Sequence, residues 1–376
     1  MKIAILTLPL NDNFGGILQA YALRQYLVKA GHEVVHVEKD DKSSLVHWSS
    51  FRFYTWWSIR WLAAQILGSS SKKEIYRQIY NFRTHTSKVR TFVANNVPRK
   101  IVNNLSVIEK ENFDILIVGS DQIWRPHYYP EIEDAFLSFA DEWRIKKVAY
   151  APSFGVQYWE FNEEQTKRCA RLLSKFDAVS VREQQGVDMC KDNFKVNPIR
   201  LIDPTMLLRL ADYQKLVGYG AKTKKSQLTT YILDMNSEKL EILDSLKKEN
   251  NMECIELGLA EQLISGQDAF QSDISVEEWL REFMQAEFIF TDSFHGCVFA
   301  ILFHKQFIVY GNKKRGLSRF KTLLQLFELE DRMVFDKVNA IDLYRDEINW
   351  EKVDVILSAE KAKSKVFFES IHLTVD

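Results

Sequence analysis

A short polar cluster holds residue types that can do acid–base chemistry. Thr291, Asp292, Ser293 and His295 follow directly after the apolar run 288–290. A histidine exchanges a proton near neutral pH, and neighbouring hydroxyl and carboxylate groups can orient it. The same cluster has a plainer interpretation, in which Asp292 or Ser293 caps a helix and His295 is only a first-turn residue. Both interpretations stay open on these residues alone.

The surrounding pattern is that of a strand, a polar turn, a helix and a second strand. Residues 288–290 are apolar, residues 296–303 stay apolar for about two helical turns, and 307–310 is another apolar run. In open parallel sheets, ligands bind where strands end and helices begin. The polar cluster is therefore predicted to lie at such an edge.

The chain begins with a strand–loop–helix–strand unit. Residues 2–8 form a buried-strand candidate, Gly15 and Gly16 open a helix pattern, and 33–37 is the next strand. The loop is neither GxGxxG nor a P-loop, so it specifies no dinucleotide. Asn13, Gly15 and Gly16 either hold a phosphate or carboxylate on backbone N–H groups or are plain packing residues.

Polar side chains also follow strands of the first half. The alternation resumes after residue 112, with predicted strands at 114–118, 147–151, 178–181 and 199–202. Ser120 and Asp121 come after the first of these strands, and Arg182 after the third. Polar side chains at the carboxyl ends of parallel strands point to a site, so all three are candidates. A purely structural role is the plainer alternative for Arg182.

A second run of alternation follows a break. The pattern is lost after residue 210 in a stretch rich in Gly and Lys, which predicts a hinge at 210–227. Beyond it, Ser275 and Glu278 form a capping box that opens a predicted helix at 276–285. We therefore expect an α/β fold of two doubly wound, Rossmann-like domains that face one cleft, with His295 in that cleft.

The expected domain boundaries follow from this break in the pattern. The N-terminal α/β domain is placed at 1–210 and the C-terminal α/β domain at 228–350. A C-terminal helix, 351–376, is expected to pack back on the N-terminal domain.

The composition excludes several classes of protein. The 376 residues carry 50 Lys+Arg against 51 Asp+Glu, which argues against a dedicated nucleic-acid binder. The four cysteines show no CxxC pair and no metal-finger spacing, so we expect no metal site and free thiols in a reducing cytoplasm. No apolar run reaches the ~18 residues of a membrane span, and no signal peptide is visible. A cytoplasmic protein is expected.

Residues 46–67 are crowded with tryptophan and other aromatic side chains. In a helix, Trp57 and Trp61 would share one face, as in amphipathic helices that lie in a membrane interface. The alternative is a subdomain that packs its aromatic side chains against the core. Both interpretations place a helical insertion at about 46–100, and the first adds peripheral contact with the inner face of the plasma membrane.

Five short motifs occur in order along the chain: NFGG at 13–16 with LQAYAL at 18–23, GSDQIW at 119–124, SVRE at 180–183, DPT at 203–205, and SFHG at 293–296 with Ala300. Through these motifs the chain resembles the polysaccharide pyruvyl transferase family along most of its length. The resemblance implies a transferase with a two-domain fold similar to the GT-B glycosyltransferases. It implies transfer of pyruvate from phosphoenolpyruvate to paired sugar hydroxyls, giving a cyclic ketal in a capsule, exopolysaccharide or cell-wall polysaccharide.

The implied chemistry assigns roles to the candidate residues. Phosphoenolpyruvate carries a carboxylate and a phosphate, so its site needs cations or helix N-termini and no separate cofactor. We assign His295 as general acid/base and Arg182 as a clamp on the donor, with Ser293 and Asp292 beside them. Neither His295 nor Arg182 is expected to belong to the core. The implied partners are phosphoenolpyruvate and a sugar acceptor, which can be a lipid-linked oligosaccharide, and no nucleic acid.

Some points stay open. Arg315 and Arg319, in the loop after residue 310, either supply a second cation or are solvated loop charges. Several family members carry an arginine two residues before the histidine, where this chain has Ser293, and a hydroxyl cannot replace a guanidinium. The alternatives are therefore a GT-B-like glycosyltransferase that uses a nucleotide-sugar, and a non-catalytic member of the family.

Overall fold

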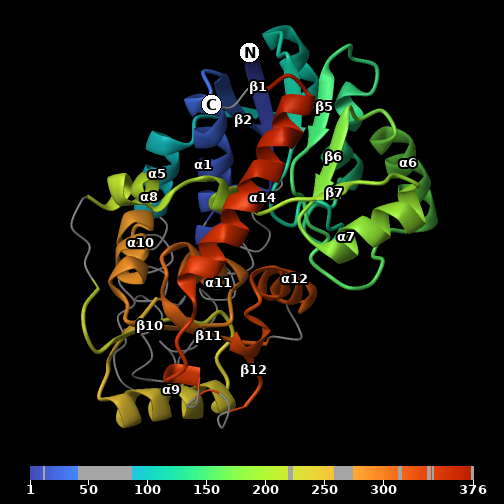
Figure 1. Ribbon diagram of the computed structural model, residues 1–376. Helices are drawn as coiled ribbons and strands as arrows, with labels where there is room; N and C mark the ends of the chain where they lie inside the picture. Colours follow the sequence, from blue (N-terminus) through green and yellow to red (C-terminus); the bar gives the residue numbers. More distant parts are fainter. Residues whose placement is uncertain are drawn as a thin grey trace, which may run out of the picture.

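The computed structural model describes residues 1–11, 13–40, 87–218, 223–257, 274–311, 316–336, 340 and 343–373. Within these ranges, two fully parallel sheets form the two halves of the molecule (Figure 1). The strand order is β3-β2-β1-β4-β5-β6-β7 in the first sheet and β12-β11-β10-β8-β9 in the second. The predicted α/β fold with two Rossmann-like halves is confirmed.

The strands are short and mostly buried. The first sheet consists of β1 (Lys2–Leu6), β2 (Glu33–Lys39), β3 (Arg99–Val102), β4 (Ile115–Val118), β5 (Lys146–Ala149), β6 (Ala178–Val181) and β7 (Ile199–Arg200). The second consists of β8 (Gln227–Tyr231), β9 (Glu253–Glu256), β10 (Phe288–Thr291), β11 (Gln306–Tyr310) and β12 (Met333–Val334). Near-continuous apolar runs such as β4 and β10 are typical of parallel strands that are covered on both faces.

The described helices connect and cover these strands. They are α1 (Phe14–Lys29), α5 (Ser87–Asn96), α6 (Glu163–Leu173), α7 (Gln184–Met189), α8 (Leu210–Val217), α9 (Ser237–Asn250), α10 (Val276–Gln285), α11 (Phe294–Leu302), α12 (Ser318–Phe327) and α14 (Trp350–Ser370). The predicted capping box is present, since the Ser275 side chain accepts from the Glu278 N–H and Glu278 bonds back to the Ser275 N–H.

Each sheet reverses its strand order at one place. Strand β1 lies between β2 and β4, and β8 lies between β9 and β10. Ligands of open α/β sheets bind beyond the carboxyl ends of the strands at such a reversal. The segments after β1, β4 and β10 carry Asn13, Ser120 with Asp121, and His295. The topology therefore brings these candidates to the reversal points.

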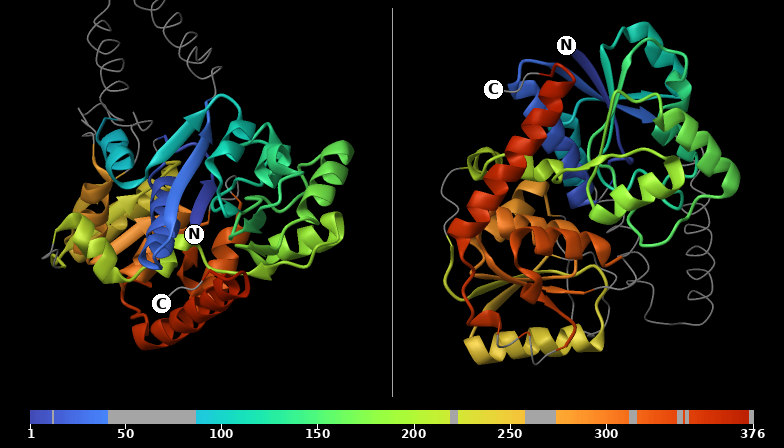
Figure 2. Two further views of the ribbon diagram at one scale, coloured as in Figure 1. Left: turned by 90° about the horizontal axis from the view of Figure 1, so that it is seen from above. Right: turned by 45° about the vertical axis from the view of Figure 1, so that its right-hand side comes forward.

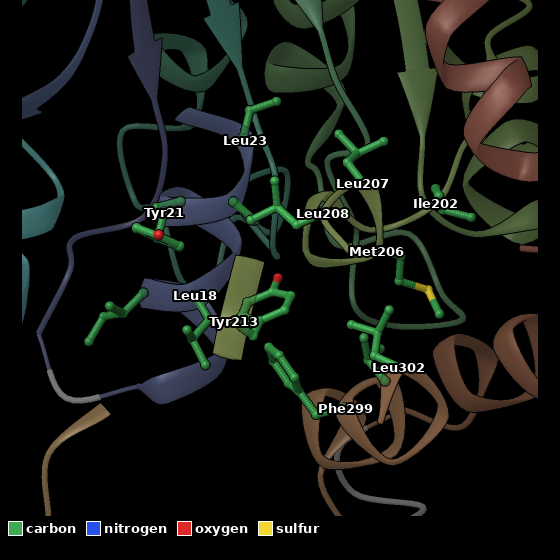
Figure 3. Packing of buried hydrophobic residues seen from close by; sticks show 14 of the residues in the cluster. Leu18, Tyr21, Leu23, Ile202, Met206, Leu207, Leu208, Tyr213, Phe299 and Leu302 are labelled. Atoms are coloured by element: carbon green, nitrogen blue, oxygen red, sulfur yellow. The ribbon is translucent and has the colours of Figure 1, made fainter. Parts of the chain in front are cut away.

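Helix α1 lies at the centre of the molecule. Its residues 14–23 are all buried, because it contacts the second half as well as its own sheet. Phe14 stacks on Trp279 of α10, with 5.7 Å between the ring centroids. Figure 3 shows Leu18 and Tyr21 of α1 near Tyr213 of α8 and Phe299 of α11. One apolar core therefore joins the two halves.

Helix α14 runs along both halves (Figures 1 and 2). Near its start, the ring of Trp350 stacks on His304 with 5.0 Å between centroids. Near its end, the Phe368 ring stacks on Tyr150, which follows β5, at 4.8 Å, and the Tyr150 hydroxyl donates to Ser364 Oγ at 3.2 Å. The last helix thus fastens the second half to the first.

Several details differ from the expectation or lie outside the described residues. The stretch predicted as a hinge begins with helix α8, which packs against α10. Arg319, predicted in a loop, lies on α12. The Trp-rich tract 46–67 lies outside the described residues, as does Arg315. In the part of the chain that the structure describes, no helix is long and apolar enough to span a membrane.

The packing of α14 gives a first prediction. Phe368 is fully buried, so Phe368→Ala should lower the free energy of unfolding by about 3–5 kcal/mol through lost burial and a cavity. Val366, on the same helix, is 62% exposed, and Val366→Ala should change it by less than about 0.5 kcal/mol. Urea denaturation of both variants measures this. Equal losses would mean that the Phe368 contact does not hold α14 in place.

Candidate active site

Two helix N-termini meet where the halves touch. Helix α1 follows β1 and is capped by Asn13, whose Oδ1 accepts the Gly15 N–H at 3.1 Å. Helix α11 follows β10 and is capped by Ser293, whose Oγ accepts the Gly296 N–H at 3.4 Å. A Cβ on Gly15 would overlap the imidazole ring of His295. Glycine is required at this position because α1 lies directly against that ring.

His295 is paired across the boundary between the halves. It lies in the first turn of α11, and its Nε2 is 3.5 Å from Oδ2 of Asp203. Asp203 follows β7 and caps the 3₁₀ turn Pro204–Leu207, where its Oδ1 accepts the Thr205 N–H at 3.0 Å and the Thr205 hydroxyl at 2.7 Å. The Thr205 bonds fix the carboxylate, which leaves Oδ2 for partners from other elements. The turn therefore both caps helix α11 and holds a histidine that faces a buried carboxylate.

Arg182 lies in a ring of carboxylates. Its Nη1 donates to Asp203 Oδ2 at 2.6 Å, its Nε donates to Glu183 Oε1 at 3.0 Å, and its Nη2 is 3.7 Å from Asp121 Oδ1. Burial alone would lower the pKa of Arg182, but the charges of Glu183, Asp203 and Asp121 raise it. Arg182 is a permanent cation at the centre of the site.

The prediction that Arg182 and His295 lie outside the core is wrong. Both are buried, because the carboxyl ends of β6 and β10 are covered by the opposite half. Removal of Arg182 would leave carboxylates buried without their cation, a loss of about 3–5 kcal/mol in comparable cases. An Arg182→Ala variant therefore changes folding stability, and its kinetics alone do not isolate a donor clamp.

Asp203 lies between Arg182 and His295. Burial disfavours its ionisation, but the proximity and charge of His295 and the charge of Arg182 outweigh burial and hold the pKa of Asp203 below its ordinary value. Its carboxylate is therefore ionised wherever the protein is folded near neutral pH. The sequence identified Asp203 only as part of the DPT motif and predicted no role for it. Its contact with His295 is visible only in the folded structure.

A second guanidinium group lies beside the first. The Cζ atoms of Arg182 and Arg319 are 4.5 Å and 5.6 Å from the centroid of the Phe294 ring. Burial and the like charge of Arg182 lower the pKa of Arg319 to about 10, so Arg319 stays charged at neutral pH. Both guanidinium groups therefore lie against the Phe294 ring, next to His295.

Asp292, another predicted site residue, makes hydrogen bonds that stabilise the elements around the site. Asp292 Oδ1 accepts the Leu233 N–H at 2.6 Å, and its Oδ2 accepts the Asp234 N–H at 3.1 Å and Lys239 Nζ at 2.7 Å. These bonds fasten the segment after β8 to the segment after β10. Asp292 therefore positions the turn that carries His295, while its own oxygens are engaged elsewhere.

The segment after β4 is fixed in the same way. The Ser120 N–H donates to Gln19 Oε1 at 3.0 Å, and the Ser120 hydroxyl donates to the Ala151 carbonyl at 2.5 Å. Asp121 points toward Arg182, and its Oδ2 would be 3.4 Å from a Cβ on Gly16. Asp121 and Gly16 thus border the site, whereas both polar groups of Ser120 are bonded within the scaffold.

Within the described ranges, no group of three or more His, Cys, Asp or Glu side chains is arranged to hold a metal ion. The arrangement instead offers a histidine beside an ionised carboxylate, two guanidinium groups and two helix N-termini. These are the parts needed to bind an anion and to move a proton.

The Asp203 contacts predict a pH dependence of stability. A carboxylate whose pKa is lower in the folded state stabilises the fold above its unfolded pKa, ~3.9, and loses this contribution as the pH falls through the folded value. The difference in unfolding free energy between wild type and Asp203→Asn should therefore be largest above about pH 5 and shrink at lower pH. Urea denaturation between pH 6 and pH 2 measures it.

The exposed Asp188 offers a matched control, and Asp188→Asn should give a small difference throughout this range. A wild-type versus Asp203→Asn difference that stays constant down to pH 2 would contradict the proposed electrostatic role of Asp203.

Comparison with known proteins supports the fold and defines the family. The chain is similar over its whole length to a solved structure of MnaA from S. aureus with UDP, at 11% identity, with 98% of that chain covered and a TM-score of 0.52. A UDP-GlcNAc 2-epimerase from Methanocaldococcus jannaschii aligns over 96% of this chain and 99% of its own, at 12% identity and a TM-score of 0.49. The first likeness shows a shared two-domain fold. No curated protein matches the sequence significantly.

The family model described as polysaccharide pyruvyl transferase matches residues 13–314, which include every residue of the site described above except Arg319. The match covers most of the chain and runs from the cap of α1 to the segment before α12. The chain is a transferase and belongs to the polysaccharide pyruvyl transferase family.

Proposed function

We propose that the protein transfers pyruvate from phosphoenolpyruvate to two hydroxyl groups of a sugar, forming a cyclic ketal. The enol carbon of the donor gains a proton and becomes a methyl group. The neighbouring carbon forms two bonds to sugar oxygens and loses its bond to the phosphate oxygen. One sugar hydroxyl proton balances the proton given to carbon, and the other leaves with the phosphate. The reaction needs no oxidant and no external cofactor.

The observation that carries this proposal is the His295–Asp203 pair. Asp203 Oδ2 lies 3.5 Å from Nε2 of the imidazole ring, so the negative charge of the carboxylate favours a proton on that nitrogen. The Nδ1 atom then lies on the side of Gly15 and the N-terminus of α1. We assign Nδ1 as the atom that exchanges the proton with donor and acceptor, and Asp203 as the group that orients the ring.

The anionic groups of the donor are assigned to the cations and helix ends around His295. Arg182 is already bonded to carboxylates, so we now give it the role of positioning Asp203. We assign the carboxylate and the phosphate to Arg319, which lies against the Phe294 ring next to His295, and to the N–H groups at the start of α1, near Asn13 and Gly16. Arg319 takes over the charge that family members carry at the position of Ser293.

This assignment has an enzymatic rival on the same fold. The similar MnaA structure contains UDP, so a nucleotide-sugar is the alternative donor. The two donors are separated by product analysis, because phosphoenolpyruvate adds a carboxylate-bearing ketal to the acceptor and a nucleotide-sugar adds a neutral sugar. A lipid-linked acceptor would bring the enzyme to a membrane face, and capsule, exopolysaccharide and cell-wall polymers are the product classes that we propose.

The role of His295 is tested by substitution. His295→Gln keeps a hydrogen-bonding side chain but cannot exchange a proton near neutral pH, so kcat for pyruvyl transfer should fall roughly 10²–10⁴-fold. His304 is a matched control, because it is exposed and pairs at the surface with Asp354 at 2.9 Å. His304→Gln should retain near-normal kcat.

Steady-state kinetics with phosphoenolpyruvate and an accepted oligosaccharide give the comparison. Circular dichroism and urea denaturation confirm that both variants fold. A folded His295→Gln variant with wild-type kcat would show that the histidine is only part of the helix-capping turn.

A further inference from the structure

Two large aromatic side chains remain exposed at the carboxyl-end edge of the first sheet. Tyr128, in the segment after β4, is 43% exposed, and Tyr158, in the segment after β5, is 63% exposed. Single exposed apolar side chains are common on soluble proteins. Two exposed tyrosines on neighbouring loops at the carboxyl-end edge of a sheet indicate a binding surface more strongly than one does. Exposed aromatic surface next to a site is where ligands dock.

The two loops are held together by Arg125. Its guanidinium group lies over the Tyr128 ring, with Cζ 4.5 Å from the ring centroid. The same group makes a forked contact with Glu160, at 3.1 Å from Nη2 and 3.2 Å from Nε to the carboxylate oxygens. Because Glu160 is two residues from Tyr158, this ion pair fixes the loops that carry the two tyrosines relative to each other.

Aromatic packing beneath the second loop makes it rigid. Trp159, between Tyr158 and Glu160, stacks on Phe161 with 4.6 Å between centroids and packs against Phe154 at 5.7 Å. The Trp159 Nε1–H donates to Thr166 Oγ1 at 2.9 Å. The segment directly after Tyr158 is therefore anchored, and the exposed side chain of Tyr158 extends from this base.

The exposed pair adjoins the proposed active site. Tyr128 follows Asp121, which borders the site, by seven residues in the segment after β4. Gly155, in the segment that leads to Tyr158, has its carbonyl against Gly316 at the approach to α12, where any Cβ would clash. Both loops therefore start at the site and carry their tyrosines outward from it.

We propose that Tyr128 and Tyr158, with Arg125 and Glu160, form the platform that binds the acceptor sugar. This inference rests on the proposed function, because it assigns the second substrate of the same site. A pyranose ring presents C–H groups of slightly positive charge, which match the negative face of a tyrosine ring. Hydroxyl groups at the ring edge can bond to the Tyr hydroxyls, Arg125 and Glu160.

The charge of the platform favours a neutral sugar over an anionic ligand. The positive charge of Arg125 is matched by Glu160, so the platform has no surplus cation for a phosphate or a carboxylate. The guanidinium groups of Arg182 and Arg319 lie instead beside Phe294. The anionic groups of the donor are therefore assigned to the region beside Phe294, and the acceptor sugar to the aromatic platform.

Acceptor binding is measured without the donor, by saturation-transfer NMR and calorimetry with a panel of neutral disaccharides of glucose, galactose, mannose and N-acetylglucosamine. Wild type should bind at least one of them. Tyr128→Ala and Tyr158→Ala should each raise its Kd about 3–10-fold, the equivalent of one lost aromatic contact. Tyr128→Phe, which keeps the ring, should stay near wild type.

Ile101 on β3 is a control for loss of exposed apolar surface, because it is 54% exposed on the edge strand far from β5 in the sheet. Ile101→Ala should not change sugar binding. In turnover, the two Tyr→Ala variants should raise KM for the acceptor and leave KM for phosphoenolpyruvate unchanged.

The outcomes separate this inference from the proposed function. Unchanged sugar binding in both Tyr→Ala variants, or no binding of any panel sugar by wild type, would overturn the platform. Loss of sugar binding in the variants together with no use of phosphoenolpyruvate by wild type would support the platform and overturn the donor assignment.

Discussion

The carboxylate of Asp203 is the point on which the site depends. It comes from the first half of the chain, donates nothing, and accepts from Thr205 and Arg182 while it faces His295 of the second half. A buried carboxylate is stable only when such partners compensate the loss of water. Because the partners come from both halves, the same contact that satisfies this charge also sets the position of the imidazole ring.

Other elements of the fold position the contact between Asp203 and His295. Helix α1 is buried between the halves, and Gly15 lets it lie against the imidazole ring. Hydrogen bonds from the segment after β8 to Asp292 fix the turn before α11, and this turn positions His295. Helix α14 then fastens the second half to the first through its stacking on Tyr150. The His295–Asp203 pair therefore lies between two halves of the molecule that are packed tightly against each other.

Much of the fold could be predicted from the sequence, and there are physical reasons why several contacts of the site could not. Apolar runs and caps predicted most strands and helices, including the capping box of α10, because local patterns determine local structure. The pattern of apolar runs placed His295 and Arg182 at strand ends, and the family resemblance gave them roles. They did not show that Arg182 is enclosed by carboxylates or that Asp203 reaches His295, because these contacts join residues 21 and 92 positions apart. Arg319 was expected in the loop after residue 310, whereas helix α12 begins at Ser318 and includes Arg319.

The central claim is that a proton is delivered to the enol carbon of phosphoenolpyruvate at the His295–Asp203 pair. The most direct measurement is pyruvyl transfer in D₂O, followed by mass spectrometry and NMR of the product. We expect wild type to form a ketal whose methyl group carries deuterium from solvent, and His295→Gln to lose this product. A transferred group without solvent deuterium in its methyl, or a product that contains no pyruvyl group, would contradict it.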